Sequence, residues 1–166
     1  MPRKLVRTNF GFMLCAVTFT VLLSFVFTTI TAASANPFQK VAGKGWRSTK
    51  ASVKLKGGVD NIKCGARYKV SGQRTTFSLK CSGPSYLINV VANFTVSGGK
   101  IKSGSWTEYS FGKKGWLSGR ANAKSASVSF RGSDVGGSMY VSLSSSRRQT
   151  INITTDGVTA KIYLRR

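Results

Sequence analysis

From about residue 50 onward, apolar and polar residues alternate in short runs, and glycine-rich turns separate one run from the next. Alternation with a period of two residues indicates a β-strand with one buried face. No stretch of this region shows the periodicity or the capping residues of a helix. The runs predict about ten strands, at residues 51–55, 61–70, 75–81, 86–96, 101–109, 115–121, 125–131 and 139–143, and on both sides of the sequence "TTDGVT".

The order of the strands predicts how they are connected. Most connections are short, so each strand is expected to pair with the next as an antiparallel meander. Such a meander either closes into a barrel or folds into two packed sheets. Closure removes the exposed sheet edges. We therefore predict an all-β fold, a single antiparallel up-and-down β-barrel with a calycin-like meander of about 8–10 strands, with a β-sandwich as the alternative.

Two neighbouring runs form a hairpin whose register follows from the alternation and the loop length. Each run has one apolar face, and a four-residue loop over 71–74 keeps the two apolar faces on the same side of the sheet. This register sets Cys64 opposite Cys81, at a separation that a disulfide can bridge. The predicted pairs are Val70 with Thr75, Tyr68 with Phe77, Ala66 with Leu79, and Cys64 with Cys81.

The same reasoning applies at the C-terminus. A two-residue turn at Asp156 and Gly157 has the commonest hairpin chemistry. It predicts that Ile153 pairs with Ala160 and Ile151 with Ile162.

The stretch "SGSWTEYSFGKKGW", residues 103–116, contains Trp106, Trp116 and the only glutamate of the chain, Glu108. A two-residue turn at residues 98–99 sets a register that carries Trp106 and Glu108 to the outer face. A five-residue loop then brings Trp116 across from Glu108. We therefore predict an outward contact patch, which consists of Leu87, Val91, Trp106, Glu108 and Trp116.

One alternative for this hairpin stays open. A one-residue bulge at residues 98–100 would rotate the strand and send Trp106 inward, opposite the small Ala92. Tryptophan is a large apolar residue that commonly contributes to a core. The bulge would also bury Glu108, and an unpaired buried carboxylate is costly. The register therefore favours the outer face, while the usual behaviour of tryptophan favours the core.

The N-terminal segment has the three parts of a secretory signal peptide. Arg3, Lys4 and Arg7 precede an apolar run from residue 11 to residue 30, and the run ends in an Ala-x-Ala exit at residues 33–35. This pattern predicts a signal peptide over residues 1–35 and export to the periplasm or the medium. An uncleaved membrane anchor is the alternative reading, because the run is long enough to span a bilayer.

The mature chain would be a single basic domain over residues 36–166. Loss of Arg3, Lys4 and Arg7 leaves 23 of the 26 basic residues against four acidic ones, a net charge of +19. Such an excess attracts anionic polymers and anionic lipid surfaces. The residues predicted to contact them lie on the polar faces of strands or in adjoining turns, namely Lys50, Lys54, Lys56, Lys63, Arg67, Lys69, Arg74 and Lys80.

The same composition argues against catalysis and metal binding. The chain has no histidine, which removes the usual general base and the commonest metal ligand. After cleavage only Cys64 and Cys81 remain as thiols, too few for a zinc shell. Glu108 has only three aspartates with which to form a pair of catalytic carboxylates. We therefore predict a protein that is not an enzyme, with no catalytic residues, metal or cofactor.

The segments "CGARYKV", "LKCSGPSY", "GKIKSGSWTE", "GWLSG" and "RRQTINI" resemble, in order and spacing, small exported β-rich proteins of alphaproteobacteria of the rhizobial group. The resemblance spans residue 46 to about residue 153. It implies a location in the cell envelope or outside a Gram-negative cell. It carries over no functional residues, because its motifs are turns and strand ends.

Three functions follow as hypotheses. The first is a non-enzymatic secreted or periplasmic protein that contacts an anionic envelope or host surface component. The second is a secreted effector or inhibitor that binds a host protein through Trp106 and Trp116. The third is a carrier of a small apolar ligand, which requires an open lumen. Nucleic acid is a poor partner for an exported chain, and no recognition motif supports it.

Overall fold

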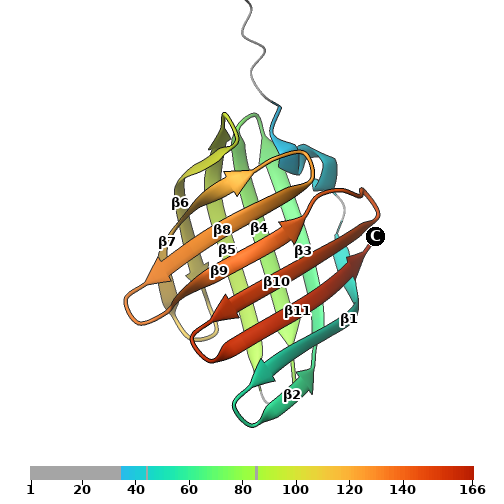
Figure 1. Ribbon diagram of the computed structural model, residues 1–166, viewed down its shortest axis with the longest axis vertical. Helices are drawn as coiled ribbons and strands as arrows, with labels where there is room; N and C mark the ends of the chain where they lie inside the picture. Colours follow the sequence, from blue (N-terminus) through green and yellow to red (C-terminus); the bar gives the residue numbers. More distant parts are fainter. Residues whose placement is uncertain (1–34, 44, 85) are drawn as a thin grey trace, which may run out of the picture. The chain divides into compact units, whose positions relative to one another are not determined.

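The computed structural model describes residues 35–43, 45–84 and 86–166. The predicted signal peptide, residues 1–35, thus lies almost entirely outside the described residues. The described part contains one 3₁₀ helix and eleven strands (Figure 1). They are η1 (Pro37–Val41), β1 (Trp46–Leu55), β2 (Gly58–Asn61), β3 (Lys63–Ser71), β4 (Arg74–Ser82), β5 (Leu87–Ser97), β6 (Lys100–Glu108), β7 (Lys113–Ala121), β8 (Ser125–Gly132), β9 (Gly136–Ser142), β10 (Arg148–Thr155) and β11 (Val158–Arg165).

The strands form one closed antiparallel barrel. From β3 to β11 each strand pairs with the next, and β11 returns to pair with β1. Strands β2 and β3 act as one interrupted strand beside β1: Leu55 pairs with Gly58 at one end of β1 and Trp46 pairs with Ala66 at the other. With β2 and β3 counted together, ten strands surround the lumen. The predicted up-and-down barrel is confirmed, and the β-sandwich alternative is not what the chain adopts.

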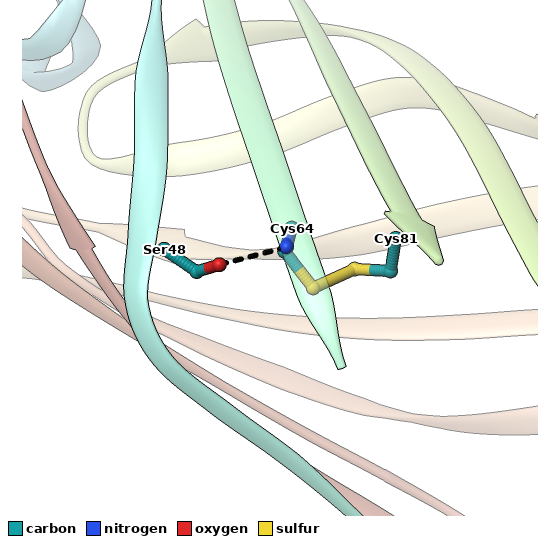
Figure 2. The surroundings of a disulfide bond; sticks show 3 residues. All are labelled: Ser48, Cys64 and Cys81. Atoms are coloured by element: carbon teal, nitrogen blue, oxygen red, sulfur yellow. Dashed lines mark hydrogen bonds between the residues drawn. A yellow bond between two sulfur atoms is a disulfide. The ribbon is translucent and has the colours of Figure 1, made fainter. Parts of the chain in front are cut away.

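The predicted cysteine hairpin is confirmed residue for residue. Cys64 pairs with Cys81 and the two form a disulfide, with their Cα atoms 4.1 Å apart (Figure 2). The loop is shorter than predicted, because Ser71 and Arg74 also pair and leave a two-residue turn. The hydroxyl of Ser48 in β1 accepts a hydrogen bond of 2.8 Å from the Cys64 backbone N–H. The disulfide is therefore buried where β1, β3 and β4 lie side by side.

The predicted C-terminal hairpin is confirmed as well. Ile153 pairs with Ala160 and Ile151 with Ile162 around the Asp156 and Gly157 turn. Strand β11 then runs beside β1, which closes the barrel.

Helix η1 seals one end of the barrel (Figure 1). Its Phe38 packs against Tyr68 and Phe94, with ring centroids 5.8 Å and 5.2 Å apart. The Tyr68 hydroxyl donates a hydrogen bond of 3.0 Å to Gln149, and burial raises the pKa of Tyr68. Large side chains thus occupy this end of the lumen. Among the described residues, no helix has the length and apolarity needed to cross a lipid bilayer.

Arg166, which follows β11, is fastened to η1 and to the start of β1 at the sealed end. Its guanidinium donates to the backbone oxygen of Val41 at 2.6 Å and lies 4.7 Å from the ring centroid of Trp46. The Trp46 indole N–H also donates to the Val41 oxygen, at 3.1 Å. The last residue of the chain therefore holds the helix that closes the lumen.

Candidate functional site

The end of the barrel opposite η1 is hollow. A cavity of about 450 Å³ occupies this half of the lumen. Its wall is aliphatic and aromatic, and it includes side chains from β1 and from every strand between β4 and β11. The wall is formed chiefly by Val53, Ile62, Phe77, Leu79, Ile88, Val90, Ala92, Trp106, Leu117, Val128, Phe130, Met139, Ile153, Val158, Ala160 and Ile162.

The cavity lies at the end of the barrel that the three largest fully buried side chains do not reach. At the sealed end Trp46, Tyr68 and Phe38 are among the largest fully buried side chains. None of these three reaches the cavity, whose wall contains Ala92 and Ala160. Small side chains on facing strands cannot meet across a barrel of ten strands, since its diameter grows with strand number. The sequence alternation alone did not reveal this space.

Trp106 lies inside the barrel, so its predicted outward orientation is wrong. It is 8% exposed, pairs with Ala92 across β5 and β6, and meets Phe130 edge to face at 5.9 Å. The cause is a β-bulge: the register holds from Lys100 to Lys102 and shifts by one residue before Ser105. The bulged residue Ser103 has a φ of 48°, a backbone conformation typical of such irregularities. The bulge considered above thus occurs, but further along the strand.

Glu108 is buried too, and it organises the turn between β6 and β7. Its carboxylate accepts hydrogen bonds from the backbone N–H groups of Asn89 (2.9 Å), Ser110 (2.9 Å) and Phe111 (2.6 Å). Burial alone would raise the pKa of Glu108, but these donors outweigh it and hold the pKa below its ordinary value. Lys113, not Trp116, lies opposite Glu108. Glu108 is therefore an ionised structural residue in the cavity wall.

The predicted contact patch does not exist as one surface. Trp116 is 62% exposed on β7 and Leu87 is 55% exposed on β5, while Val91 is half-buried. Strand β6 separates Trp116 from Leu87 and Val91. The β6 residue that pairs with Trp116 is Ser105. With Trp106 and Glu108 inside, the remaining members are scattered single residues.

The mouth of the cavity is polar at one side. Lys113 and Asp134 form an ion pair there, the one ion pair found among the described residues. Hydrogen bonds from Lys113 and Ser133 hold the pKa of Asp134 below its usual range. Phe111, which is mostly exposed, lines the mouth beside them. Sequence reasoning missed this rim; the signal was an apolar residue, Phe111, inside a predicted loop.

The predicted cationic residues are all exposed but divide into two groups. On adjacent strands β3 and β4, five of them share the outer face, namely Lys63, Arg67, Lys69, Arg74 and Lys80. Lys50 and Lys54 lie on β1 and Lys56 follows it in the turn. Strand β1 borders β11, so Lys50 lies next to Tyr163 and Lys54 next to Thr159.

Comparisons with known proteins identify no family. No family model matches the chain, and no curated protein matches it. Among solved structures, a redesigned β-barrel, mFAP1, bound to DFHBI, is 14% identical with a TM-score of 0.47, over 80% of this chain and 100% of that chain. Another redesigned barrel, b11L5F_LGL, is 10% identical with a TM-score of 0.48, over 81% of this chain and 97% of that one. At these scores, the fold assignment depends on the strand pairing described above.

Proposed function

We propose that this protein binds a small apolar molecule in the lumen of its barrel. The observation that carries the proposal is the cavity of about 450 Å³, sealed at one end by η1 and lined by apolar side chains. This volume lies within the range of small-molecule sites. A ligand that covers the wall gains about 25 cal/mol for each Å² of apolar surface removed from water.

Trp106 leaves one polar atom of the cavity wall without a hydrogen-bond partner. Its buried indole nitrogen has no hydrogen-bond partner among the described residues, whereas the Glu108 carboxylate is satisfied. A buried donor without an acceptor costs about 1–3 kcal/mol. This nitrogen has less than 1 Å² of accessible surface, so a ligand in the lumen does not contact it unless the indole moves. The wall therefore offers a ligand mainly apolar contact.

The test compares a substitution that fills the lumen with one that does not. Ala160 lines the cavity and its neighbour Thr159 is exposed on the same strand. In a titration with the apolar dye N-phenyl-1-naphthylamine, A160F should abolish the fluorescence increase and T159F should retain it. Thermal unfolding of both variants checks that each is folded. Dye binding that survives in A160F would contradict the proposal.

A second function, contact with an anionic envelope or host surface component, is favoured by the cations of β3 and β4. These five exposed side chains face serine, threonine, glycine or asparagine on the strands beside them, and none faces a carboxylate. Because no internal ion pairs neutralise these cations, they attract an external polyanion with their full charge. The disulfide is consistent with an oxidising compartment, and thus with export of the chain.

Retention on heparin tests this second function. Elution should shift to earlier fractions as salt rises, because salt screens exposed charges. Replacing Lys63, Arg67 and Lys69 by serine should shorten retention more than replacing Lys100, Lys102 and Arg120, which are exposed on β6 and β7. Retention that persists unchanged to about molar salt would refute it. Host-protein contact through Trp106 loses its basis, since that side chain is buried.

A further inference from the structure

Closure of the barrel aligns three arginines that are far apart in the sequence. Arg148 of β10 pairs with Arg165 of β11, and Arg165 also pairs with Arg47 of β1. Directly paired residues point to the same face of a sheet, and neighbouring strands lie about 4.8 Å apart. All three side chains are exposed. The outer surface of the barrel therefore presents a row of adjacent guanidinium groups where its first and last strands meet.

No acidic side chain among the described residues pairs with this row. The four acidic residues of the chain are Asp60, Glu108, Asp134 and Asp156. All lie at the open end, in or close to the turns that connect β1 to β2, β6 to β7, β8 to β9 and β10 to β11. The arginine row lies at the opposite, sealed end. Like charges directly opposite each other on neighbouring strands are destabilising, so an anion bound between these arginines would relieve their repulsion.

The surface beside the row is hollowed and rich in hydrogen-bond donors. A groove of about 710 Å³ lies over β10, β11 and the start of β1. Lys50, Arg148 and Arg165 line it, together with the hydroxyl groups of Ser144, Ser145 and Tyr163. None of the acidic residues lines it. Guanidinium, ammonium and hydroxyl donors around one depression form the usual recognition set for a phosphate group.

One wall of the groove is held in place by the loop between β9 and β10. The Ser145 hydroxyl accepts hydrogen bonds of 3.1 Å from the backbone N–H groups of Arg147 and Arg148. Leu143 is fully buried, and its N–H donates to the Lys124 oxygen at 2.7 Å. The start of β10, and with it Arg148, is therefore fixed relative to Arg165.

We propose that this groove binds a phosphomonoester, with Arg148 and Arg165 closing on its oxygens from adjacent strands and Lys50 adding a third positive charge. Two fork-shaped guanidinium groups match the oxygens of a phosphate better than those of a smaller, singly charged carboxylate. The site is on the outer surface and is independent of the lumen. It differs from the diffuse attraction of β3 and β4 because the charges here converge on one depression.

Vesicle binding tests the proposal. The protein is titrated with phosphatidylcholine vesicles that contain phosphatidic acid, a phosphomonoester, or the same molar charge of phosphatidylglycerol, a phosphodiester. The wild type should bind the phosphatidic acid vesicles more tightly. R148A/R165A should weaken this binding about tenfold or more, as expected for the loss of charge-assisted hydrogen bonds. R67A/R74A, which removes the same charge from β3 and β4, should weaken it about twofold, as expected for exposed charges.

Further arms define the ligand and the geometry. Displacement of the protein from vesicles by glycerol 3-phosphate identifies the phosphate group alone as the ligand; binding that resists it identifies a headgroup held at a lipid surface. R148K/R165K keeps the charge but loses the fork, so its binding should fall between that of the wild type and that of R148A/R165A. Equal losses in R148A/R165A and R67A/R74A, equal binding of the two vesicle types, or wild-type binding by R148K/R165K would each overturn the site.

Discussion

Trp106 of β6 is the direct cross-strand neighbour of Ala92 of β5, and both side chains point into the barrel. Trp116 of β7 faces solvent. The bulge at Ser103 turns Trp106 into the wall of the lumen cavity, whereas Trp116 lies on the outer face.

This contrast predicts different costs for the two truncations. W106A should lower the free energy of unfolding by about 3 kcal/mol, because it removes a buried aromatic side chain. W116A should change it by less than about 0.5 kcal/mol, as is usual for surface substitutions. Urea denaturation of both variants measures the difference. Equal losses would mean that Trp106 is not packed inside.

The bulge itself can be tested at Gly104. A Cβ atom there would lie 2.2 Å from Leu117 Cδ1 and 2.6 Å from the Leu117 backbone oxygen. G104A should therefore destabilise the protein by about 1–3 kcal/mol through overpacking. G136A is the matched control, since its Cβ would meet only the Phe130 oxygen at an ordinary 3.6 Å. The two chemical denaturation midpoints should differ; coinciding midpoints would argue against the bulge.

Glu108 predicts a pH dependence. Its pKa is lower in the folded protein than in the unfolded chain, so the folded state binds fewer protons and stability rises with pH. Glu108 therefore contributes to the free energy of unfolding at a pH above its pKa in the unfolded chain, about 4.3. This contribution is lost as the pH falls through its pKa in the folded protein.

E108Q should therefore be less stable than the wild type near neutral pH, by about 1–3 kcal/mol for the lost charge-assisted bonds, and the gap should narrow in acid. Denaturation midpoints across this pH range measure it. D156N, at an exposed turn, controls for the loss of a carboxylate. A gap that stays constant with pH would show that Glu108 does not carry the effect.

The disulfide predicts a change in both mass and stability. Reduction should raise the intact mass by two hydrogens. C64S/C81S should lower the free energy of unfolding by about 3 kcal/mol. This is the loss expected when a loop of this size is released, since the cysteines are 17 residues apart. Alkylation of both thiols in the unreduced protein would show that the bond does not form.

Local pattern explains which features were predictable from the sequence. The two hairpins were correct because short turns and strict alternation leave only one register that keeps an apolar face. The prediction for Trp106 is wrong because the bulge at Ser103 inverts the later side chains of β6 without interrupting the alternation. The lumen depends on how side chains from all strands fill the interior, and the arginine row depends on the pairing of β1 with β11, which are far apart in the sequence. Neither the lumen nor the arginine row can be predicted from a short stretch of sequence.

The position of the four carboxylates at the mouth makes the barrel an electric dipole along its axis. The sealed end carries cations without acids, so a field from an anionic surface turns that end towards the surface. The mouth then points away from it, into the aqueous phase. Under the two proposals above, a barrel held in this way would exchange a lumen ligand with solution and not with the anionic surface.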